Sequence, residues 1–437
     1  MVSDRAALLG TTLVLTLLLA ACDDVELNQV APAALPEWTV MVYMAADNNL
    51  SVPAIENLDQ MEAAGVSERV RVVIQAEFSP RFLAAVGCDA SCFNRPNFNT
   101  FRYVITGEGE DTPGPDGPAI DLGNRNMTDP AELREFVQWV QANHPARRYL
   151  VILWDHGGGY SGLLSDETSA PQQAMQLREL PVAFAGLRFD VLDFDMCLMG
   201  AYETLANVGS VASQVVFSQE LVPGQGLPYT QLLTSINADP TLDARQMAML
   251  LVEEYDRFYS GGEFSTTLSA YTTAGFPAFE SALGALATEL RAELPALGPT
   301  VASAAAASQR YYLPETKDLV DLLDSLSVRL DDPTLESRIA SVRARAIDPN
   351  FRLRSTFNNG TEAGENDVSR SNGLSIVLPS GQAGDRFETS GDRSFANYQA
   401  QMSGRPWTSF LDQFVAGQPT DPGGTDSEGN GHRCNVR

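Results

Sequence analysis

Short, continuous runs of apolar, β-branched and aromatic residues recur along the first half of this chain and constrain its fold more than any other feature. A strand that is apolar on both faces needs cover on both faces, which a parallel sheet between two helical layers supplies. The chain is therefore expected to build a mostly parallel sheet. The runs occupy residues 38–44, 70–76, 101–105, 149–154, 191–194 and 215–217.

Stretches with helical spacing separate these runs. Residues 52–64 and 130–143 have apolar side chains at helical intervals, and Asp129 followed by Pro130 is typical of a helix start. Alternating strands and helices predict an α/β fold, in which right-handed crossovers place helices on both faces of the sheet. We assign residues 38–228 to this domain.

After about Tyr229 the sequence changes from short apolar runs to longer stretches with helical spacing. Residues 229–416 are predicted to form a mostly helical C-terminal part, with a late strand within 373–379. Residues 417–437 are polar and contain Pro, Gly and Asp, which predicts a disordered tail. The longer helical stretches lie at 244–259, 279–294 and 319–330.

The N-terminus resembles a bacterial lipoprotein signal. Arg5 precedes an apolar run at 6–21, which is shorter than the roughly 20 residues that a membrane-spanning helix needs, and small residues lead into Cys22. Residues 1–21 are predicted to be the signal peptide, Cys22 the lipidated residue and residues 22–37 the anchor and linker. An ordinary secretory signal cut at the same boundary is the alternative. Either signal would place the mature protein outside the cytoplasm.

The charge balance limits the class of partner. The 437 residues include 56 acidic and 29 basic side chains, a formal net charge of −27. Nucleic acids and anionic membrane surfaces are disfavoured, because both carry phosphate groups that an acidic surface repels. The charge fits a soluble protein or one that attracts cationic peptides. Membrane contact is therefore expected only through the lipid anchor.

The positions of the five cysteines separate their roles. Cys22 belongs to the signal, and Cys434 lies in the tail. Cys88 and Cys92 lie close enough to form a bridge in an oxidising compartment. Cys197 remains, inside an apolar segment. A leftover cysteine in a secreted protein is either a buried thiol or a reactive one, so its surroundings decide its role.

Two of the expected strands end in residues that carry chemistry. The strand at 149–154 runs into Asp155 and His156, which three glycines follow. The strand at 191–194 runs into Asp195 and Cys197, and then into a stretch at 198–208 that is expected to be helical. Functional groups gather at the carboxyl ends of parallel strands. His156 and Cys197 are therefore expected to emerge at the same edge of the sheet.

An imidazole beside a thiol permits nucleophilic catalysis. The thiolate is the nucleophile, and a nearby imidazole or helix N-terminus favours it. Glycines let backbone N–H groups approach a substrate carbonyl and stabilise an oxyanion. Taken singly, His156 could be structural and Cys197 a buried thiol. Their joint placement favours catalysis, because His144 and His432 do not follow strands.

Four segments follow one another along the chain: MVYMAADNNL at 41–50, WDHGGG at 154–159, DFDMCLMG at 193–200 and SQELVPG at 218–224. In this order they resemble the clostripain family of cysteine peptidases, which is related to caspases, gingipains and legumains. The resemblance implies a caspase-like fold and an endopeptidase that cleaves after Arg or Lys through an acyl-enzyme. Matched residue by residue, Cys197 is the nucleophile, His156 the general acid/base, and the N–H groups of Gly157 and Cys197 the oxyanion donors.

The resemblance also implies a pocket for the basic side chain of the substrate. Asp195 matches its acidic residue, and a carboxylate pairs well with a guanidinium through two parallel hydrogen bonds. Capping of the following helix is the alternative role for Asp195. Ser218, Glu220 and Asp47 are further candidates for substrate binding, because each follows an expected strand.

Two residues depart from the family pattern, and two further properties are implied by the resemblance. Met196 is bulkier than the small residue usual before the nucleophile, and Gln219 replaces a residue that is often acidic or small. Both departures from the family pattern bear on the shape of the pocket and on how strictly it selects Arg. Family members are often cleaved between the His and Cys strands, where Arg178 is the favoured position for self-cleavage. Some members need calcium, although the sequence itself requires no cofactor and shows no metal-ligand spacing.

Other functions fit the sequence less well. The main alternative is a non-catalytic, caspase-like surface lipoprotein that binds peptides or glycans. A serine hydrolase function is disfavoured, because Ser161 does not lie in the G-x-S-x-G motif that surrounds the nucleophile of such enzymes. Proteins or peptides are therefore the expected substrates.

Overall fold

A computed structural model describes residues 35–89, 97–105, 119–209 and 211–422, all within one compact unit. The predicted signal peptide, Cys22 and most of the linker fall outside these residues, as do Cys92 and residues 423–437 of the predicted tail. Within the described ranges, no helix combines the length and apolar character needed to cross a membrane.

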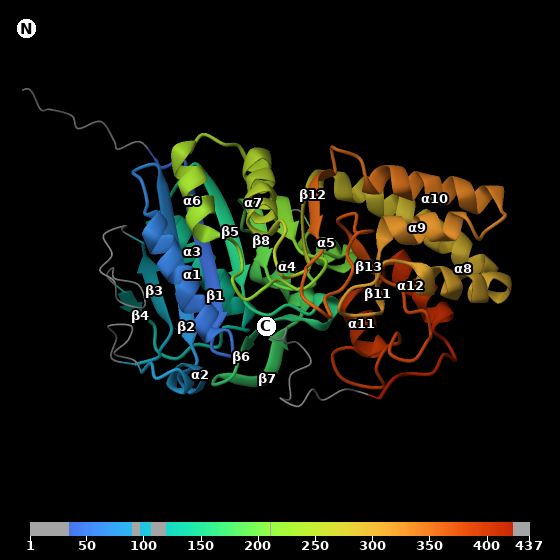
Figure 1. The fold of residues 1–437 in the computed structure, drawn as a ribbon, viewed down its shortest axis with the longest axis horizontal. Helices are drawn as coiled ribbons and strands as arrows, with labels where there is room; N and C mark the ends of the chain where they lie inside the picture. Colours follow the sequence, from blue (N-terminus) through green and yellow to red (C-terminus); the bar gives the residue numbers. More distant parts are fainter. Residues whose placement is uncertain (1–34, 90–96, 106–118, 210, 423–437) are drawn as a thin grey trace, which may run out of the picture. The chain divides into compact units, whose positions relative to one another are not determined.

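Within the described residues, the main sheet contains nine strands in the order β12-β10-β9-β8-β5-β1-β2-β3-β4 (Figure 1). The five strands from β9 to β2 in this order are mutually parallel. The strands are β1 (Trp38–Ala46), β2 (Val70–Phe78), β3 (Phe101–Val104), β4 (Ala119–Asp121), β5 (Arg148–Trp154), β8 (Phe189–Asp195), β9 (Ala212–Phe217), β10 (Thr266–Thr272) and β12 (Arg352–Asn358).

All six strands expected from the apolar runs are present, and the mostly parallel sheet is confirmed. The exception in direction is β3, which runs antiparallel to β2 and pairs on its other side with β4. The run at 101–105 carries Arg102 between Phe101 and Tyr103. This alternation is typical of an antiparallel strand near the edge of a sheet rather than of a parallel strand within it.

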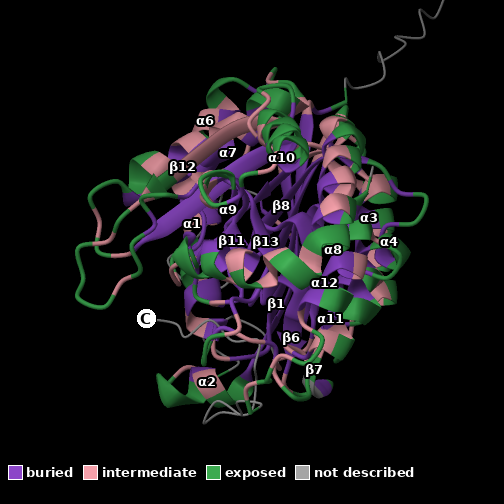
Figure 2. Ribbon diagram, turned by 90° about the vertical axis from the view of Figure 1, so that its right-hand side faces the viewer, coloured by how far each residue is buried: buried purple, intermediate pink, exposed green. Residues whose placement is uncertain are grey.

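Helices cover both faces of the parallel strands (Figure 2). One face packs against α1 (Ser51–Ala64), α6 (Tyr229–Ala238) and α7 (Ala244–Tyr259), whose apolar side chains share a core with Val42, Ile152 and Val191. The opposite face shares a core with three further helices, α3 (Pro130–Asn143), α4 (Leu180–Ala183) and α5 (Tyr202–Val208).

The C-terminal part contributes both helices and strands. Its helix α8 packs against α9, α10 and α12, and the core of this group is continuous with the second face of the sheet. Its strands β10 and β12 extend the main sheet in antiparallel fashion. The helices are α8 (Phe276–Ala307), α9 (Leu319–Ser327), α10 (Pro333–Ala346), α11 (Phe395–Gln401) and α12 (Pro406–Phe414).

Short elements complete the described fold. The late strand expected within 373–379 is β13 (Ser375–Val377), which pairs with β11 (Thr316–Asp318) in a separate two-stranded sheet. A hairpin of β6 (Leu163–Asp166) and β7 (Ala170–Met175) follows the His156 loop, and α2 (Pro80–Ala85) follows β2.

Candidate active site

The predicted convergence of strand ends is present in the fold. Met44 on β1 lies opposite Trp154 on β5, which lies opposite Asp195 on β8. Strand β9 runs parallel to β8 and ends at Phe217. The loops that begin at these four ends therefore lie along one edge of the sheet.

His156, Asp195 and Cys197 line one small pocket at this edge, with a volume of about 30 Å³. His156 is 1% exposed, Cys197 3% and Asp195 6%. His156 and Cys197, which the sequence predicted to act together, thus line the same cavity. The lining residues are Leu50, Trp154, Asp155, His156, Asp195, Met196, Cys197, Val222, Pro223, Gly224 and Gly226.

The loop after His156 lies directly against the backbone of the Cys197 turn. A Cβ atom at Gly157 would lie 2.4 Å from the carbonyl oxygen of Cys197, and one at Gly159 would lie 3.1 Å from that of Leu198. Gly159 also has a φ of +58°. Glycine is needed at position 157 because any side chain there would push the two loops apart.

Cys197 begins a tight turn rather than a helix. Leu198 has a φ of +65°, and its N–H donates to the Glu220 carbonyl (3.2 Å). Helix α5 starts only at Tyr202, so the expectation of a helix from residue 198 is wrong. The chain first turns back onto the loop after β9, because the Gly200 N–H donates to the Ser218 carbonyl (2.6 Å).

The sulfur of Cys197 contacts the backbone of the loop after β9. The Val222 N–H donates to Sγ (3.2 Å). Sγ also lies 3.8 Å from the Val222 carbonyl oxygen. Cys92 lies outside the described residues, so the expected bridge between Cys88 and Cys92 stays a prediction. The thiolate is the form of Cys197 that could act as a nucleophile.

The His156 ring contacts the loop after β1. Its Nε2 lies 2.8 Å from Oδ1 of Asn49, a residue that the sequence reasoning did not single out. The neighbouring Asn48 donates through Nδ2 to Asp155 Oδ1 (2.7 Å) and to Ser165 Oγ (3.0 Å). Burial raises the pKa of Asp155 to about 8. The residue beside the imidazole is therefore mostly uncharged at neutral pH.

Asp195 faces the loop that closes the pocket. Its Oδ2 accepts hydrogen bonds from the Leu227 N–H (3.1 Å) and from the Tyr229 hydroxyl (2.8 Å). A Cβ atom at Gly226 would lie 2.7 Å from the same oxygen. Helix α5 starts after Ala201 without a side-chain cap, so Asp195 does not cap it. Burial raises the pKa of Asp195 to about 6.

A second carboxyl group lies two residues earlier on the same face of β8. Asp193 is fully buried, and neither of its oxygens has a hydrogen-bond partner among the described residues. Burial, and then the nearby Asp195, raise the pKa of Asp193 well above its usual value. Asp195 is therefore the member of this pair that carries charge at neutral pH.

The three further candidates for substrate binding are buried and do not line the pocket. Ser218 bonds with the Thr267 hydroxyl (2.9 Å), and Glu220 accepts from the Leu221 N–H (2.9 Å) and from Asn366 Nδ2 (2.9 Å). Asp47 accepts from the backbone N–H (2.9 Å) and the hydroxyl (2.6 Å) of Thr168. Burial raises the pKa of Asp47 to about 6. These side chains hold loops in place around Cys197 and His156.

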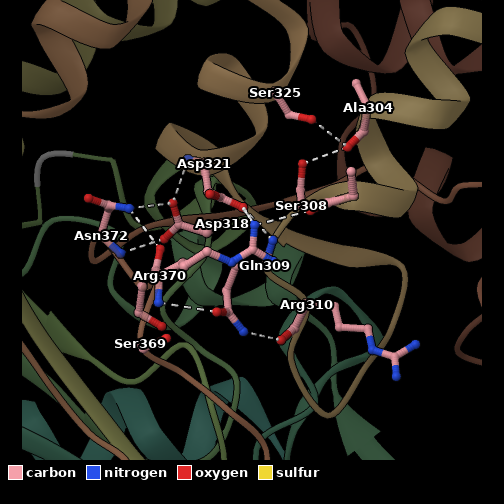
Figure 3. A network of polar contacts seen from close by, with 12 residues as sticks. Ala304, Ser308, Gln309, Arg310, Asp318, Asp321, Ser325, Ser369, Arg370 and Asn372 are labelled. Carbon is pink, nitrogen blue, oxygen red and sulfur yellow. Dashed lines mark hydrogen bonds and ion pairs between the residues drawn. The ribbon is translucent and has the colours of Figure 1, made fainter. Parts of the chain in front are cut away.

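Gln219 connects the active-site loops to the C-terminal part. Its Nε2 donates to Asp318 Oδ2 (3.1 Å), and its Oε1 accepts from the Gly373 N–H (2.9 Å). Asp318 also accepts from the backbone and side chain of Asn372 (2.6 and 3.1 Å), as Figure 3 shows. Gln219, which departs from the family pattern, thus has a structural role: its side chain connects the loop after β9 to the C-terminal part.

Two remaining expectations concern processing and metal. Arg178 is exposed in a short 3₁₀ helix, and its N–H donates to Oε1 of Gln401 (3.0 Å). Among the residues that the structure describes, no group of three or more His, Cys, Asp or Glu side chains is arranged to hold a metal ion. Calcium dependence therefore stays a prediction of the resemblance.

Asn49 and the loop at 222–229 are the parts of the site that sequence reasoning missed. Asn49 did have a signal in the sequence, because it follows β1 within the segment at 41–50. Asp47 was the residue predicted to bind substrate in that segment. Tyr229 and Leu227 gave no signal, since their contacts with Asp195 depend on how the loop folds back.

Comparisons with known proteins agree with this architecture. Clostripain from Hathewaya histolytica is 25% identical over 318 residues, which is 58% of this chain and 56% of that relative. The chain thus spans little more than half the length of the curated relative.

Two solved structures share the fold at low sequence identity. An inactive zymogen C11 protease from Parabacteroides distasonis matches with a TM-score of 0.63 and 18% identity, over 87% of this chain and 99% of the other. A secreted C11 cysteine protease from Bacteroides thetaiotaomicron, in complex with an irreversible peptide inhibitor, matches with a TM-score of 0.59 and 18% identity, over 86% and 99%. A model described as the clostripain family matches residues 42–402, most of the described fold. The chain therefore belongs to the clostripain family.

Proposed function

We propose that this protein is a cysteine endopeptidase that hydrolyses peptide bonds after Arg or Lys, with Cys197 as nucleophile and His156 as general acid/base. The observation that carries the proposal is the single pocket shared by the imidazole, the sulfur and a buried carboxyl group. A nucleophile, its proton acceptor and a group selective for a basic side chain are the parts that this reaction needs.

The first half of the reaction forms an acyl-enzyme. His156 takes the Sγ proton of reduced Cys197, and the thiolate attacks the scissile carbonyl carbon, forming a C–S bond. The N–H groups of Gly157 and Cys197 are proposed to stabilise the resulting oxyanion. When the tetrahedral intermediate collapses, the C–N bond breaks and His156 protonates the leaving amine.

The second half releases the product. His156 takes a proton from a water molecule, whose oxygen attacks the thioester carbonyl carbon. The C–S bond then breaks, the new carboxylic acid leaves, and the sulfur recovers its proton. The close approach of the Gly157 loop to the Cys197 backbone supports this scheme, because it presents both proposed N–H donors from one rigid corner.

The preference for basic side chains is proposed to arise at Asp195. A carboxylate with little exposure gains more from a cation than from water, and it selects guanidinium or ammonium over neutral groups. The surrounding loop supports this role, because a Cβ atom at Gly226 would lie only 2.7 Å from Asp195 Oδ2 and glycine avoids this clash with the carboxylate.

A cleavage profile tests the proposed function. The reduced protein is incubated with a peptide library that varies the residue before the scissile bond. We expect cleavage after Arg and Lys, and loss of activity when reductant is omitted, because only the thiolate attacks. Binding of peptides without any cleavage after full reduction would instead favour the non-catalytic alternative.

We also propose that the chain is a lipoprotein anchored outside the cytoplasm through Cys22. The N-terminal pattern supports this proposal. In a bacterial expression host, the full chain is expected in the detergent phase of a phase-separation assay, and Cys22→Ser in the aqueous phase. Equal partition of both proteins would remove the anchor from the proposal.

A further inference from the structure

The His156 imidazole is buried in a position that demands an orienting partner. At 1% exposure it has almost no contact with water, so its hydrogen bonds to protein groups decide which nitrogen carries the proton. The contact between Nε2 and Asn49 Oδ1 (2.8 Å) has the length of a good hydrogen bond.

The chemistry of this contact specifies a tautomer. An amide oxygen only accepts hydrogen bonds, so Nε2 must carry the proton that is donated to Asn49. The other nitrogen, Nδ1, is then the atom that exchanges a proton with the nucleophile.

The loop that carries Asn49 is held firmly. Asn48 Oδ1 accepts from the Leu50 N–H (2.8 Å), and Asn48 Nδ2 donates to Ala45 O (3.0 Å). The Ser51 hydroxyl donates to the Ala46 carbonyl (2.6 Å). These bonds hold both neighbours of Asn49, so its side chain reaches the imidazole from a rigid turn between β1 and α1.

We propose that Asn49 is the positioning residue of His156, completing a Cys–His–Asn arrangement that holds the imidazole in the Nε2–H tautomer with Nδ1 directed at Cys197. The inference rests on the proposed function, in which Cys197 and His156 perform catalysis. An amide suits this role because it orients the ring without adding a negative charge.

Kinetics of three variants test the assignment. Asn49→Ala should lower kcat by roughly 10- to 100-fold with little change in KM, because a disoriented imidazole forfeits part of the 10²–10⁴-fold gain from positioned acid–base catalysis. Asn49→Asp keeps an acceptor and should recover most of kcat. Its carboxylate should stabilise the imidazolium and move the alkaline limb of the pH profile upward by about one unit.

The matched control is Asn237→Ala. Asn237 donates a comparable amide hydrogen bond to the Gly65 carbonyl (3.2 Å), at the opposite end of α1 from Asn49. It should retain the parent kcat and pH profile. Asn49→Ala with parent kcat and pH profile, in a preparation whose parent cleaves peptides, would overturn the inference while leaving the proposed function intact. A parent without Cys197-dependent cleavage would instead overturn the function.

A spectroscopic readout makes the inference independent of activity. In the Cys197→Ala background no thiolate can pair with the ring, and the chain has three histidines, so ¹⁵N-histidine NMR can resolve them. Above its pKa, His156 should show the Nε2–H tautomer, and Asn49→Ala should produce a mixture. A dominant Nδ1–H tautomer before the Asn49 substitution would mean that the amide NH₂ faces the ring, which contradicts the assignment.

Discussion

Cys197→Ala is expected to abolish peptide hydrolysis, with kcat/KM falling by at least about 10⁴-fold, because the acyl-enzyme route is lost with its nucleophile. The fold should persist, since a small buried side chain becomes slightly smaller. Peptide hydrolysis is measured on the reduced protein, and labelling with an acyloxymethyl ketone that carries Arg or Lys should modify the parent protein but not the variant.

Cys88→Ala is the matched control for this substitution. Cys88 lies in the loop after α2 and outside the pocket lining, so its removal should leave hydrolysis and labelling unchanged.

Self-cleavage gives a second readout of the Cys197→Ala substitution. The parent chain should be cut between β5 and β8, with Arg178 as the proposed position, while Cys197→Ala stays intact. Full activity in Cys197→Ala would end the proposed mechanism.

Asp195→Asn is expected to lower kcat/KM for substrates with Arg before the scissile bond by roughly 10²–10³-fold. Loss of one partner from a buried, hydrogen-bonded charge pair costs about 2–5 kcal/mol. Substrates with a neutral residue at that position should change by only a few fold, because the nucleophile and the imidazole are untouched. The measurement is the ratio of kcat/KM for matched Arg and norleucine peptides.

The same ratio should depend on pH in the parent protein. The pKa of Asp195 is raised to about 6, so its charge is present above pH 6 and is lost as the pH falls through that value. The preference for Arg should therefore weaken on acidification, and taking a ratio cancels the titration of His156 and Cys197. Asp195→Asn should show no such dependence.

Asp190→Asn is the control for Asp195→Asn. Asp190 lies near the opposite end of β8 and accepts a hydrogen bond from the Tyr149 N–H (2.8 Å). It should keep the parent preference and its pH dependence. Equal losses for Arg and norleucine substrates in Asp195→Asn would show that the carboxylate supports the fold rather than specificity.

Elements with a strong local pattern were predicted well. Helices α3 and α7 match the expected ranges at both ends, because their apolar spacing and their Asp caps are encoded in consecutive residues. Strands β10 and β12 were missed, since both alternate polar and apolar residues and lie in a region dominated by helical patterns. Helix α5 was predicted to start too early, because a positive φ at Leu198 leaves no mark in the sequence.

The sequence by itself determined the α/β class and the edge at which His156 and Cys197 meet, because parallel strands must bring their carboxyl ends together. Only the tertiary structure decided that Asn49 faces His156 across 107 residues and that Tyr229 holds Asp195. The physical reason is that periodicity records which face of a strand or helix is buried. The direction of a loop side chain instead depends on hydrogen bonds with residues distant in the chain.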